Sequence, residues 1–223
     1  MSYQIAIDGP AGAGKSTIAK AVAKKLGYIY VDTGAMYRAM ALYLLRQGIR
    51  ADECEKISAA SRDADITIVY RDGLQQVLLN GENVTGFLRT EEVGNMASAS
   101  SVNRDVRLKL VELQRELAER ENVVMDGRDI GTYVLPKANV KVYLTASPAC
   151  RAKRRFDELK EKGETCDLAA IEADIIERDK RDMEREFAPL RQAEDAVYVD
   201  SSDMTISQVV QRILDIYREK AED

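Results

Sequence analysis

The residues best suited to chemistry lie near the start of the chain, where glycines alternate with small residues before a lysine and two hydroxyl groups. Residues 9–17 read Gly-Pro-Ala-Gly-Ala-Gly-Lys-Ser-Thr. This matches the spacing G-x-x-x-x-G-K-[ST], in which glycines allow successive backbone N–H groups to surround a phosphate. Lys15 adds a mobile positive charge, and the Ser16 hydroxyl is the predicted Mg²⁺ ligand. The predicted donor is therefore ATP with Mg²⁺, bound by Gly9, Pro10, Ala11, Gly12, Ala13, Gly14, Lys15, Ser16 and Thr17.

Two arginines follow short polar strings that end predicted strands. Arg38 comes after Asp-Thr-Gly-Ala-Met-Tyr at residues 32–37, and Arg128 lies within Asp-Gly-Arg-Asp at residues 126–129. Parallel sheets place ligand-binding groups directly after their strands. Both arginines are therefore candidates for binding an anion beside the phosphate loop.

Three further arginines, Arg178, Arg181 and Arg185, are spaced three and four residues apart on one predicted helix. At about 100° per residue they share a face about 60° wide, with Asp182 close to it. A solvated charged face is one interpretation of this pattern. The phosphate loop favours the other, because phosphoryl transfer needs cations around developing negative charge.

The sequence contains no histidine, which excludes Ser-His-Asp hydrolysis and histidine-ligated zinc. A phosphate acceptor needs no general base, since a nucleoside monophosphate with a second pKa near ~6 is mostly dianionic at neutral pH. A hydroxyl acceptor, as in a shikimate-type kinase, would need a carboxylate, and an aspartate base remains an alternative. A GTP switch is the weaker alternative, because the guanine-reading N-K-x-D and T-K-x-D strings are absent.

Four strings together resemble the bacterial cytidylate kinases, over essentially the whole chain. They occupy residues 8–17, 32–38 and 126–132, and residues 177–182 running into Ala-Pro-Leu at 188–190. The resemblance implies an α/β P-loop NTPase fold with a five-stranded parallel sheet, a nucleotide-binding insert and a short lid. It also implies direct in-line phosphorylation of CMP and dCMP to CDP and dCDP.

The same resemblance implies roles for individual residues. Lys15, Arg128, Arg178, Arg181 and Arg185 would be catalytic. The implied acceptor-binding residues are Thr33, Arg38, Ser98, Arg107, Arg128, Asp129, Asp182 and Arg185. Among these, Arg38, Arg128 and Arg185 would hold the acceptor phosphate, Ser98, Arg107 and Asp129 would read cytosine, and Asp182 would contact the sugar.

Several of these assignments leave alternatives open. Ser98 could be exchanged with Ser100 or Ser101, and Arg107 could be a surface arginine on an amphipathic helix. Asp32 and Asp126 each fit either a turn at the end of a strand or a residue that orients the waters of Mg²⁺.

Hydrophobic periodicity predicts the scaffold. Apolar runs at 3–8, 28–31, 123–125, 140–144 and 196–200 indicate strands, and helical patterns between them favour a parallel sheet covered on both faces. Runs at 66–70 and 75–79 flank Arg-Asp-Gly-Leu and predict a hairpin. We therefore expect a core of 1–62 and 89–223, a β insert at 63–88, and a lid near 155–168 hinged at Gly163.

Composition limits the partners and the location. The net charge of −5 argues against a nucleic-acid partner, and no apolar run is long enough to span a membrane. Three widely spaced cysteines predict a reducing cytoplasm, and the N-terminal residues lack the pattern of a signal peptide. No apolar repeat demands a partner, so we expect a monomer.

Overall fold

A computed structural model describes residues 2–71 and 74–222 of the chain. Its main sheet has five parallel strands in the order β2-β6-β1-β7-β8. The strands are β1 (Gln4–Asp8), β2 (Ile29–Asp32), β6 (Val123–Gly127), β7 (Val140–Thr145) and β8 (Val197–Asp200). The predicted α/β fold with a five-stranded parallel sheet is confirmed, with every strand within a few residues of its predicted position.

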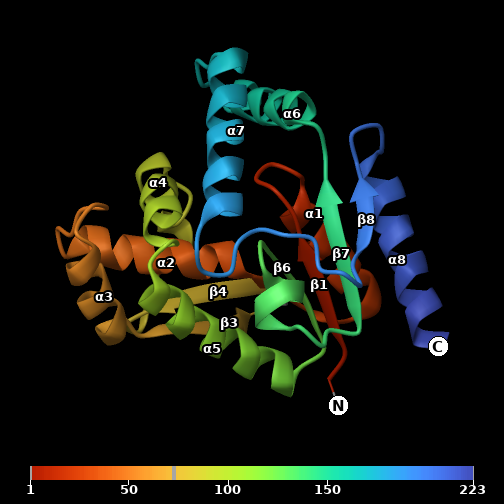
Figure 1. The fold of residues 1–223 in the computed structure, drawn as a ribbon, viewed down its shortest axis with the longest axis horizontal. Coiled ribbons are helices and arrows are strands. Elements are labelled where there is room, and N and C mark those ends of the chain that lie inside the picture. The colour runs from red at the N-terminus through yellow and green to blue at the C-terminus, as the bar shows by residue number, and fades with distance from the viewer. Residues whose placement is uncertain (1, 72–73, 223) are drawn as a thin grey trace.

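Helices cover both faces of this sheet (Figure 1). On one face pack α1 (Lys15–Leu26) and α8 (Ile206–Glu222), and on the other α2 (Thr33–Arg46) and α5 (Arg104–Arg120). Strand β1 shows the alternation that this arrangement requires. Ile5 and Ile7 belong to the buried cluster of α1 and α8, whereas Ala6 belongs to the cluster of α2 and α5.

A second, antiparallel sheet contains β3 (Ile66–Arg71), β4 (Leu74–Leu79) and the short β5 (Glu82–Asn83). The predicted pairing of the first two strands is present, and their connection at Asp72 and Gly73 lies outside the described residues. A 3₁₀ turn at Thr85–Phe87 and α4 (Glu91–Ser100) follow, and α3 (Cys54–Asp63) precedes the sheet.

The second sheet shares the core of the main sheet. Its buried residues Ile66, Val77 and Leu79 belong to the same cluster as Met36 and Met40 of α2. The proposed insert is therefore packed onto the rest of the chain, and its boundaries at 63 and 88 stay a prediction.

Two helices, α6 (Pro148–Glu161) and α7 (Leu168–Glu184), project beyond the carboxyl edge of the main sheet (Figure 1). Gly163 lies in their connection with a positive φ of 77°. Helix α7 ends one residue before Arg185, which adopts an extended backbone, so the three predicted arginines do not all lie within the helix. In a continuous helix the ring of Pro189 would clash with the carbonyl group of Arg185, four residues earlier, so the helix cannot run unbroken through Arg185 to Pro189.

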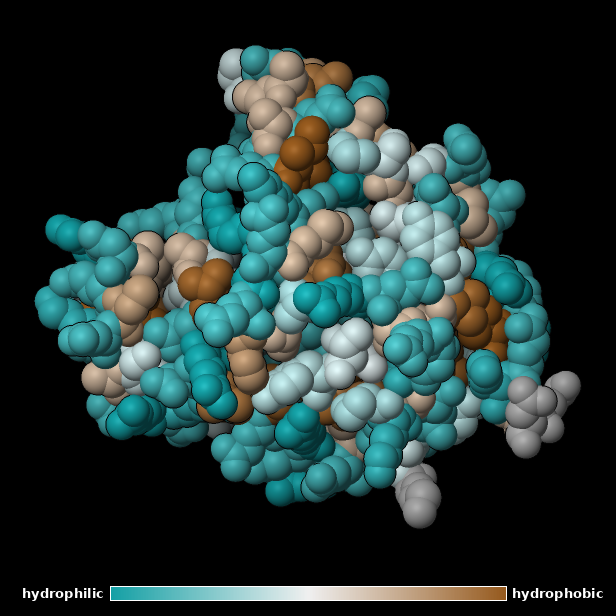
Figure 2. Space-filling view, viewed as in Figure 1, coloured by the Kyte–Doolittle hydropathy of each residue, from teal (hydrophilic) through white to brown (hydrophobic). Residues whose placement is uncertain are grey.

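The surface seen from the direction of Figure 1 is largely hydrophilic, and its apolar residues form scattered patches (Figure 2). Within the described part of the chain, each helix is too short or too polar to cross a lipid bilayer.

The phosphate loop requires glycine at its first position. Gly9 has a φ of 151°, and a Cβ there would lie 1.9 Å from the carbonyl oxygen of Leu144 in β7. That contact is with backbone, so it cannot be relieved by a change of side-chain rotamer. Gly9 therefore lets β1 turn sharply into the loop while β7 packs directly beside it.

We predict that Gly9→Ala lowers the free energy of unfolding by about 3 kcal/mol or more, through overlap with Leu144 and backbone strain. Gly86→Ala is the matched control, since its Cβ would meet nothing within 4 Å and Gly86 has no positive φ. Urea unfolding of both variants measures the difference. Equal stability of the two variants would contradict the close approach of Gly9 and β7.

Candidate active site

A cavity of about 760 Å³ opens at the carboxyl edge of the main sheet. Its walls come from the phosphate loop, the first turns of α2 and α8, α4 to α7, and the end of β6. Carboxyl ends of parallel strands meet at this edge, so residues far apart in the sequence can surround one ligand.

The phosphate loop occupies the floor of the cavity between β1 and α1. Gly12 and Gly14 adopt positive φ values of 74° and 81°, and α1 begins at Lys15 with its positive end toward the cavity. Lys15 is buried and donates to the carbonyl oxygen of Pro10 at 2.7 Å. Burial, and then the nearby charge of Arg128, lowers the pKa of the Lys15 ammonium to about 7.

Asp8, the last residue of β1, fixes the turn that follows β6. Its two carboxylate oxygens accept from the N–H groups of Ile130 and Gly131, at 2.8 and 2.7 Å. These residues open a single π-helical turn, Ile130–Val134, which the sequence analysis did not predict. Burial raises the pKa of Asp8 to about 7, although both N–H groups oppose that shift.

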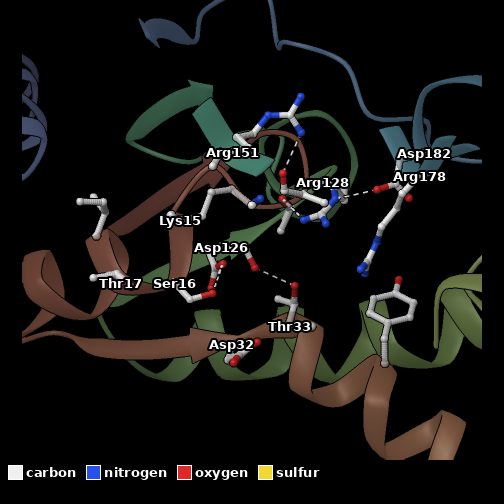
Figure 3. A pocket seen from close by; sticks show the side chains of 18 of the residues that line it. Lys15, Ser16, Thr17, Asp32, Thr33, Asp126, Arg128, Arg151, Arg178 and Asp182 are labelled. Atoms are coloured by element: carbon white, nitrogen blue, oxygen red, sulfur yellow. Dashed lines mark hydrogen bonds and ion pairs between the residues drawn. The ribbon is translucent and has the colours of Figure 1, made fainter. Parts of the chain in front are cut away.

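Side chains whose oxygen atoms could hold a magnesium ion gather beside the loop (Figure 3). Ser16 donates to Asp126 Oδ2 at 3.1 Å, and the phenol of Tyr30 donates to Asp126 Oδ1 at 2.8 Å. Asp32 ends the neighbouring strand, directly opposite Asp126 in the register of β2 and β6. Burial, and then the charge of Asp32, raises the pKa of Asp126 to about 6.

These groups fit Mg²⁺, which usually takes one or two protein oxygens and fills its other positions with water and phosphate. Among the described residues, no group of three or more histidine, cysteine or carboxylate side chains could cage a metal. Of the two aspartates left open by the sequence, Asp126 contacts Ser16. The Asp32 carboxylate instead accepts from the N–H of Ala35 at 2.9 Å and caps α2.

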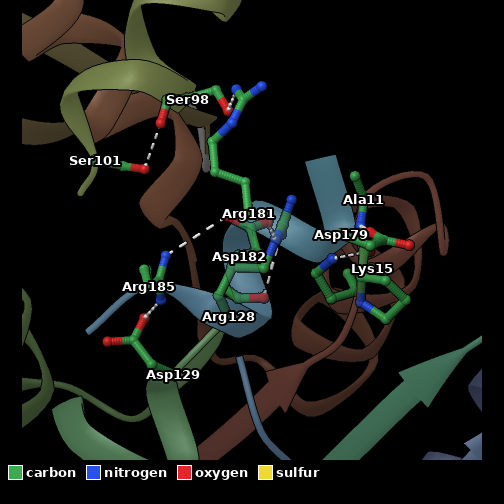
Figure 4. Close-up of polar contacts among 12 residues, drawn as sticks. Ala11, Lys15, Ser98, Ser101, Arg128, Asp129, Asp179, Arg181, Asp182 and Arg185 are labelled. Carbon is green, nitrogen blue, oxygen red and sulfur yellow. Dashed lines mark hydrogen bonds and ion pairs between the residues drawn. The ribbon is translucent and has the colours of Figure 1, made fainter. Parts of the chain in front are cut away.

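A chain of alternating charges crosses the acceptor side of the cavity (Figure 4). Arg107 donates to Asp129 at 2.5 Å, and Asp129 lies 3.4 Å from Arg185. Arg185 lies 3.6 Å from Asp182, which accepts from Arg128 at 2.8 Å. We call this set the charge chain; its members are Arg107, Asp129, Arg185, Asp182 and Arg128.

The arginines near Asp182 shift its pKa. Burial alone would raise the pKa of Asp182, but the neighbouring guanidinium groups of Arg128, Arg185 and Arg178 outweigh it and hold that pKa below its ordinary value. Arg107 is only 1% exposed, so the alternative of a surface arginine is wrong. Asp182 and Asp129 therefore lie between three arginines that are close together, and offset part of the repulsion between them.

Two more arginines point into the cavity with weaker counterions. Arg38 approaches Asp32 no closer than 3.4 Å, and within the described residues Arg178 has no ion pair. The Nε atoms of both are buried and find no hydrogen-bond partner in that part of the chain. Burial, and then the charge of Arg128, lowers the pKa of Arg178. An anionic ligand would satisfy both side chains.

Most of the predicted site residues line this cavity. They are Ala11 to Thr17, Thr33, Arg38, Ser98, Arg107, Arg128, Asp129, Arg178, Asp182 and Arg185. Of the three serines left open, Ser98 and Ser101 line it and the buried Ser100 does not. Gly9 and Pro10 belong to the phosphate loop but do not line the cavity.

Arg181 is placed differently from the other predicted arginines. It is not among the lining residues, pairs with Glu177 at 3.0 Å, and donates to the hydroxyl of Ser98 at 3.1 Å. The side chain thus links α7 to α4 (Figure 4). Its predicted catalytic role stays a prediction.

Sequence reasoning missed the residues that tie the projecting helices to the loop. Arg151 pairs with Asp179 at 2.7 Å and donates to the carbonyl oxygen of Ala11 at 2.8 Å, while the N–H of Ala11 donates to Asp179 at 3.2 Å. The basic run at 151–155, in the helix that follows β7, is a signal that could have indicated them.

Gln114 was also missed. It lines the cavity two turns beyond Arg107 on α5, is 1% exposed, and its Nε2 has no partner among the described residues. A glutamine in an amphipathic helix gives no sign of this position.

A glycine-rich phosphate loop between a strand and a helix, facing a cavity lined with arginines, defines a P-loop kinase. The model of the family described as cytidylate kinase matches residues 5–219, so the chain belongs to the cytidylate kinase family. A cytidylate kinase of Caldicellulosiruptor saccharolyticus is 54% identical over 213 residues, which cover 96% of this chain and 94% of that protein. A cytidylate kinase of Bacillus subtilis is 46% identical over 217 residues, 97% of both chains.

Solved structures agree on the fold alone. A gluconokinase from Sinorhizobium meliloti superposes with a TM-score of 0.51 at 15% identity, covering 99% of this chain and 94% of its own. An uncharacterized protein from Eubacterium ventriosum superposes with a TM-score of 0.53 at 13% identity, covering 98% of this chain and 99% of its own.

We predict that nucleotide binding takes up a proton at pH 8. The pKa of Lys15 lies near 7 in the free protein, below its ordinary 10.5, so much of the side chain is neutral at pH 8. Phosphate groups favour the charged form and raise that pKa, which draws in up to about one proton. Calorimetric titration with ADP in two buffers of different ionisation enthalpy measures this uptake. Lys15→Met should abolish it, and an unchanged uptake in that variant would contradict the assignment.

Proposed function

We propose that this protein transfers the γ-phosphoryl group of ATP, bound with Mg²⁺, to CMP or dCMP, giving ADP and CDP or dCDP. The observation that carries the proposal is one cavity joining the phosphate loop to the charge chain. Membership of the cytidylate kinase family supports the acceptor.

The cavity has two ends, which residues from different parts of the fold line. Lining residues of the β8 side include Ser201 and Ile206, beside Arg154 and Arg155 of α6, whereas Arg107 comes from α5 on the opposite side of the sheet. We assign the first end to the base of ATP and the second to CMP. The phosphate loop lies between them, where the two phosphate chains would meet.

The chain's own residues carry the transfer by position and charge. Lys15 and the N–H groups of the loop would hold the β- and γ-phosphates of ATP, and Ser16 with Asp126 would hold Mg²⁺ and its waters. Bound Mg²⁺ neutralises charge on the transferring phosphates. Arg128, Arg178 and Arg185 would stabilise the charge that develops between donor and acceptor.

The acceptor phosphate needs orientation and no base, since it is mostly dianionic at neutral pH. Arg38 and Arg178, whose Nε atoms have no hydrogen-bond partner among the described residues, suit this phosphate. Asp182 lies beside Arg128 and Arg185 and could accept from a sugar hydroxyl. We further propose that α6, α7 and the predicted lid at 155–168 move to exclude water, because a hydrated site would hydrolyse ATP.

Base choice follows from the donor and acceptor pattern at the far end of the cavity. An ionised Asp129 only accepts hydrogen bonds, so it suits the N4 amine of cytosine and repels the O4 carbonyl of uracil. Arg107 only donates, which suits N3 and O2 of cytosine. Arg107 and Arg185 hold Asp129 from two sides, so its carboxylate is fixed before the base arrives.

A coupled assay of ADP release with CMP, dCMP, UMP and shikimate tests the proposed function. We expect turnover of CMP and dCMP. Turnover of shikimate, with none of any nucleotide, would overturn the proposal. The cytoplasmic location, the monomeric state and the absence of a nucleic-acid partner stay predictions from the sequence.

We predict that CMP exceeds UMP by at least about tenfold in kcat/KM, since one buried mismatch costs about 1–3 kcal/mol. Asp129→Asn should reduce the ratio of kcat/KM between CMP and UMP, because an amide can rotate to donate to uracil O4. The exposed Asp52→Asn is the control, since it removes the same charge from a surface pair with Arg50. If Asp129→Asn lowers kcat/KM for CMP and for UMP by the same factor, Asp129 holds arginines and does not read the base.

A further inference from the structure

Strand β2 lies at one edge of the main sheet, and two side chains of the second sheet bond to the backbone groups on its outer side. The phenol of Tyr70 donates to the carbonyl oxygen of Tyr30 at 3.1 Å. The N–H of Asp32 donates to Gln75 Oε1 at 2.8 Å, and Gln75 Nε2 donates to the carbonyl oxygen of Asp32 at 3.3 Å. Tyr70 and Gln75 are directly opposite each other in the ladder of β3 and β4.

The geometry of a strand explains why these two positions are covered. Tyr30 and Asp32 are two residues apart, so their peptide groups point to the same side of β2, away from β6. A primary amide carries a donor and an acceptor like those of a peptide group. Gln75 therefore replaces a neighbouring strand at Asp32, whereas Tyr70 makes one bond at Tyr30.

Asp32 is the residue from which the acceptor side of the site is built. Its carboxylate caps α2 through the N–H of Ala35 and lies 3.4 Å from Arg38, one and a half turns into that helix. The next residue, Thr33, donates to the carbonyl oxygen of Asp126 at 2.7 Å. A displacement of the Asp32 peptide would therefore move the start of α2, and Arg38 with it.

We infer that Gln75 is a positioning residue for the acceptor phosphate. By holding both peptide groups of Asp32, it fixes the first turn of α2 and the direction of the Arg38 guanidinium. Gln75 does not line the cavity, so it would act through Asp32 and not by contact with a nucleotide. This inference rests on the proposed function, which assigns CMP to that end of the cavity.

The chain offers two matched controls. Gln76 follows Gln75 on the same strand and points to the other side, where its Oε1 accepts from Asn83 at 3.1 Å. Gln76→Met thus makes the same change in side chain without touching β2. Tyr70→Phe removes a hydrogen bond to the same edge of β2, at Tyr30, and leaves the bonds at Asp32 in place.

Steady-state kinetics with the full chain tests the inference, after wild-type turnover of CMP has established the activity. We expect Gln75→Met to raise KM for CMP about three- to tenfold while KM for ATP stays within about twofold, because a small misplacement of a binding group weakens only its own ligand. Gln76→Met and Tyr70→Phe should keep both KM values within about twofold.

Amide hydrogen exchange on the substrate-free protein gives a second readout. Gln75→Met should speed exchange at Asp32 and Ala35, and leave Val31, within the ladder to β6, protected. If Gln75→Met does not fold, Gln75→Glu replaces it, since it keeps the acceptor for the Asp32 N–H and loses the donor. Unchanged KM for CMP, equal rises for CMP and ATP, or unchanged exchange at Ala35 would overturn the inference. Absence of CMP turnover in the wild type would instead contradict the proposed function.

Discussion

The site depends on keeping buried arginines charged and close together. An isolated buried charge is very costly, and neighbouring guanidinium groups repel each other. Here Asp129 and Asp182 lie between three arginines, so that each carboxylate is shared by two cations and the set keeps one excess positive charge. Arg38 and Arg178 have weaker counterions, and the cavity between them has room for an anion. A phosphate completes an arrangement that the protein leaves short of negative charge.

The fold produces this arrangement by joining distant segments at one edge of a sheet. Gly9 lets β1 turn beside β7, and Asp8 fixes the turn after β6 that carries Arg128 and Asp129 toward the cavity. Helix α7 adds Asp182 from the far end of the chain, while its Asp179 accepts from the loop at Ala11. Because the phosphate loop and α7 share this contact, a movement of α7 would displace the phosphate loop and the charge chain together.

Local patterns in the sequence predicted the parallel sheet, the phosphate loop and the pairing of β3 with β4. These patterns could not predict features that depend on contacts between residues distant in the sequence. The pairing of Arg151 with Asp179 joins residues of two different helices, and the burial of Arg107 and Gln114 depends on how α5 packs. The helix predicted to include Arg185 ends at Glu184, because a continuous helix would bring the ring of Pro189 against the carbonyl group of Arg185. The shared core of the two sheets likewise leaves no mark in the composition of residues 63–88.

The most direct test of the central claim is calorimetric titration with a bisubstrate analogue, in which a polyphosphate chain joins adenosine to cytidine. If one cavity holds both nucleotides with their phosphates between the phosphate loop and the charge chain, one analogue binds per chain and prevents binding of both ATP and CMP. Its affinity should fall as ionic strength rises, because several cations contact the phosphates. An analogue that displaces ATP while CMP still binds with its original affinity would contradict a shared cavity.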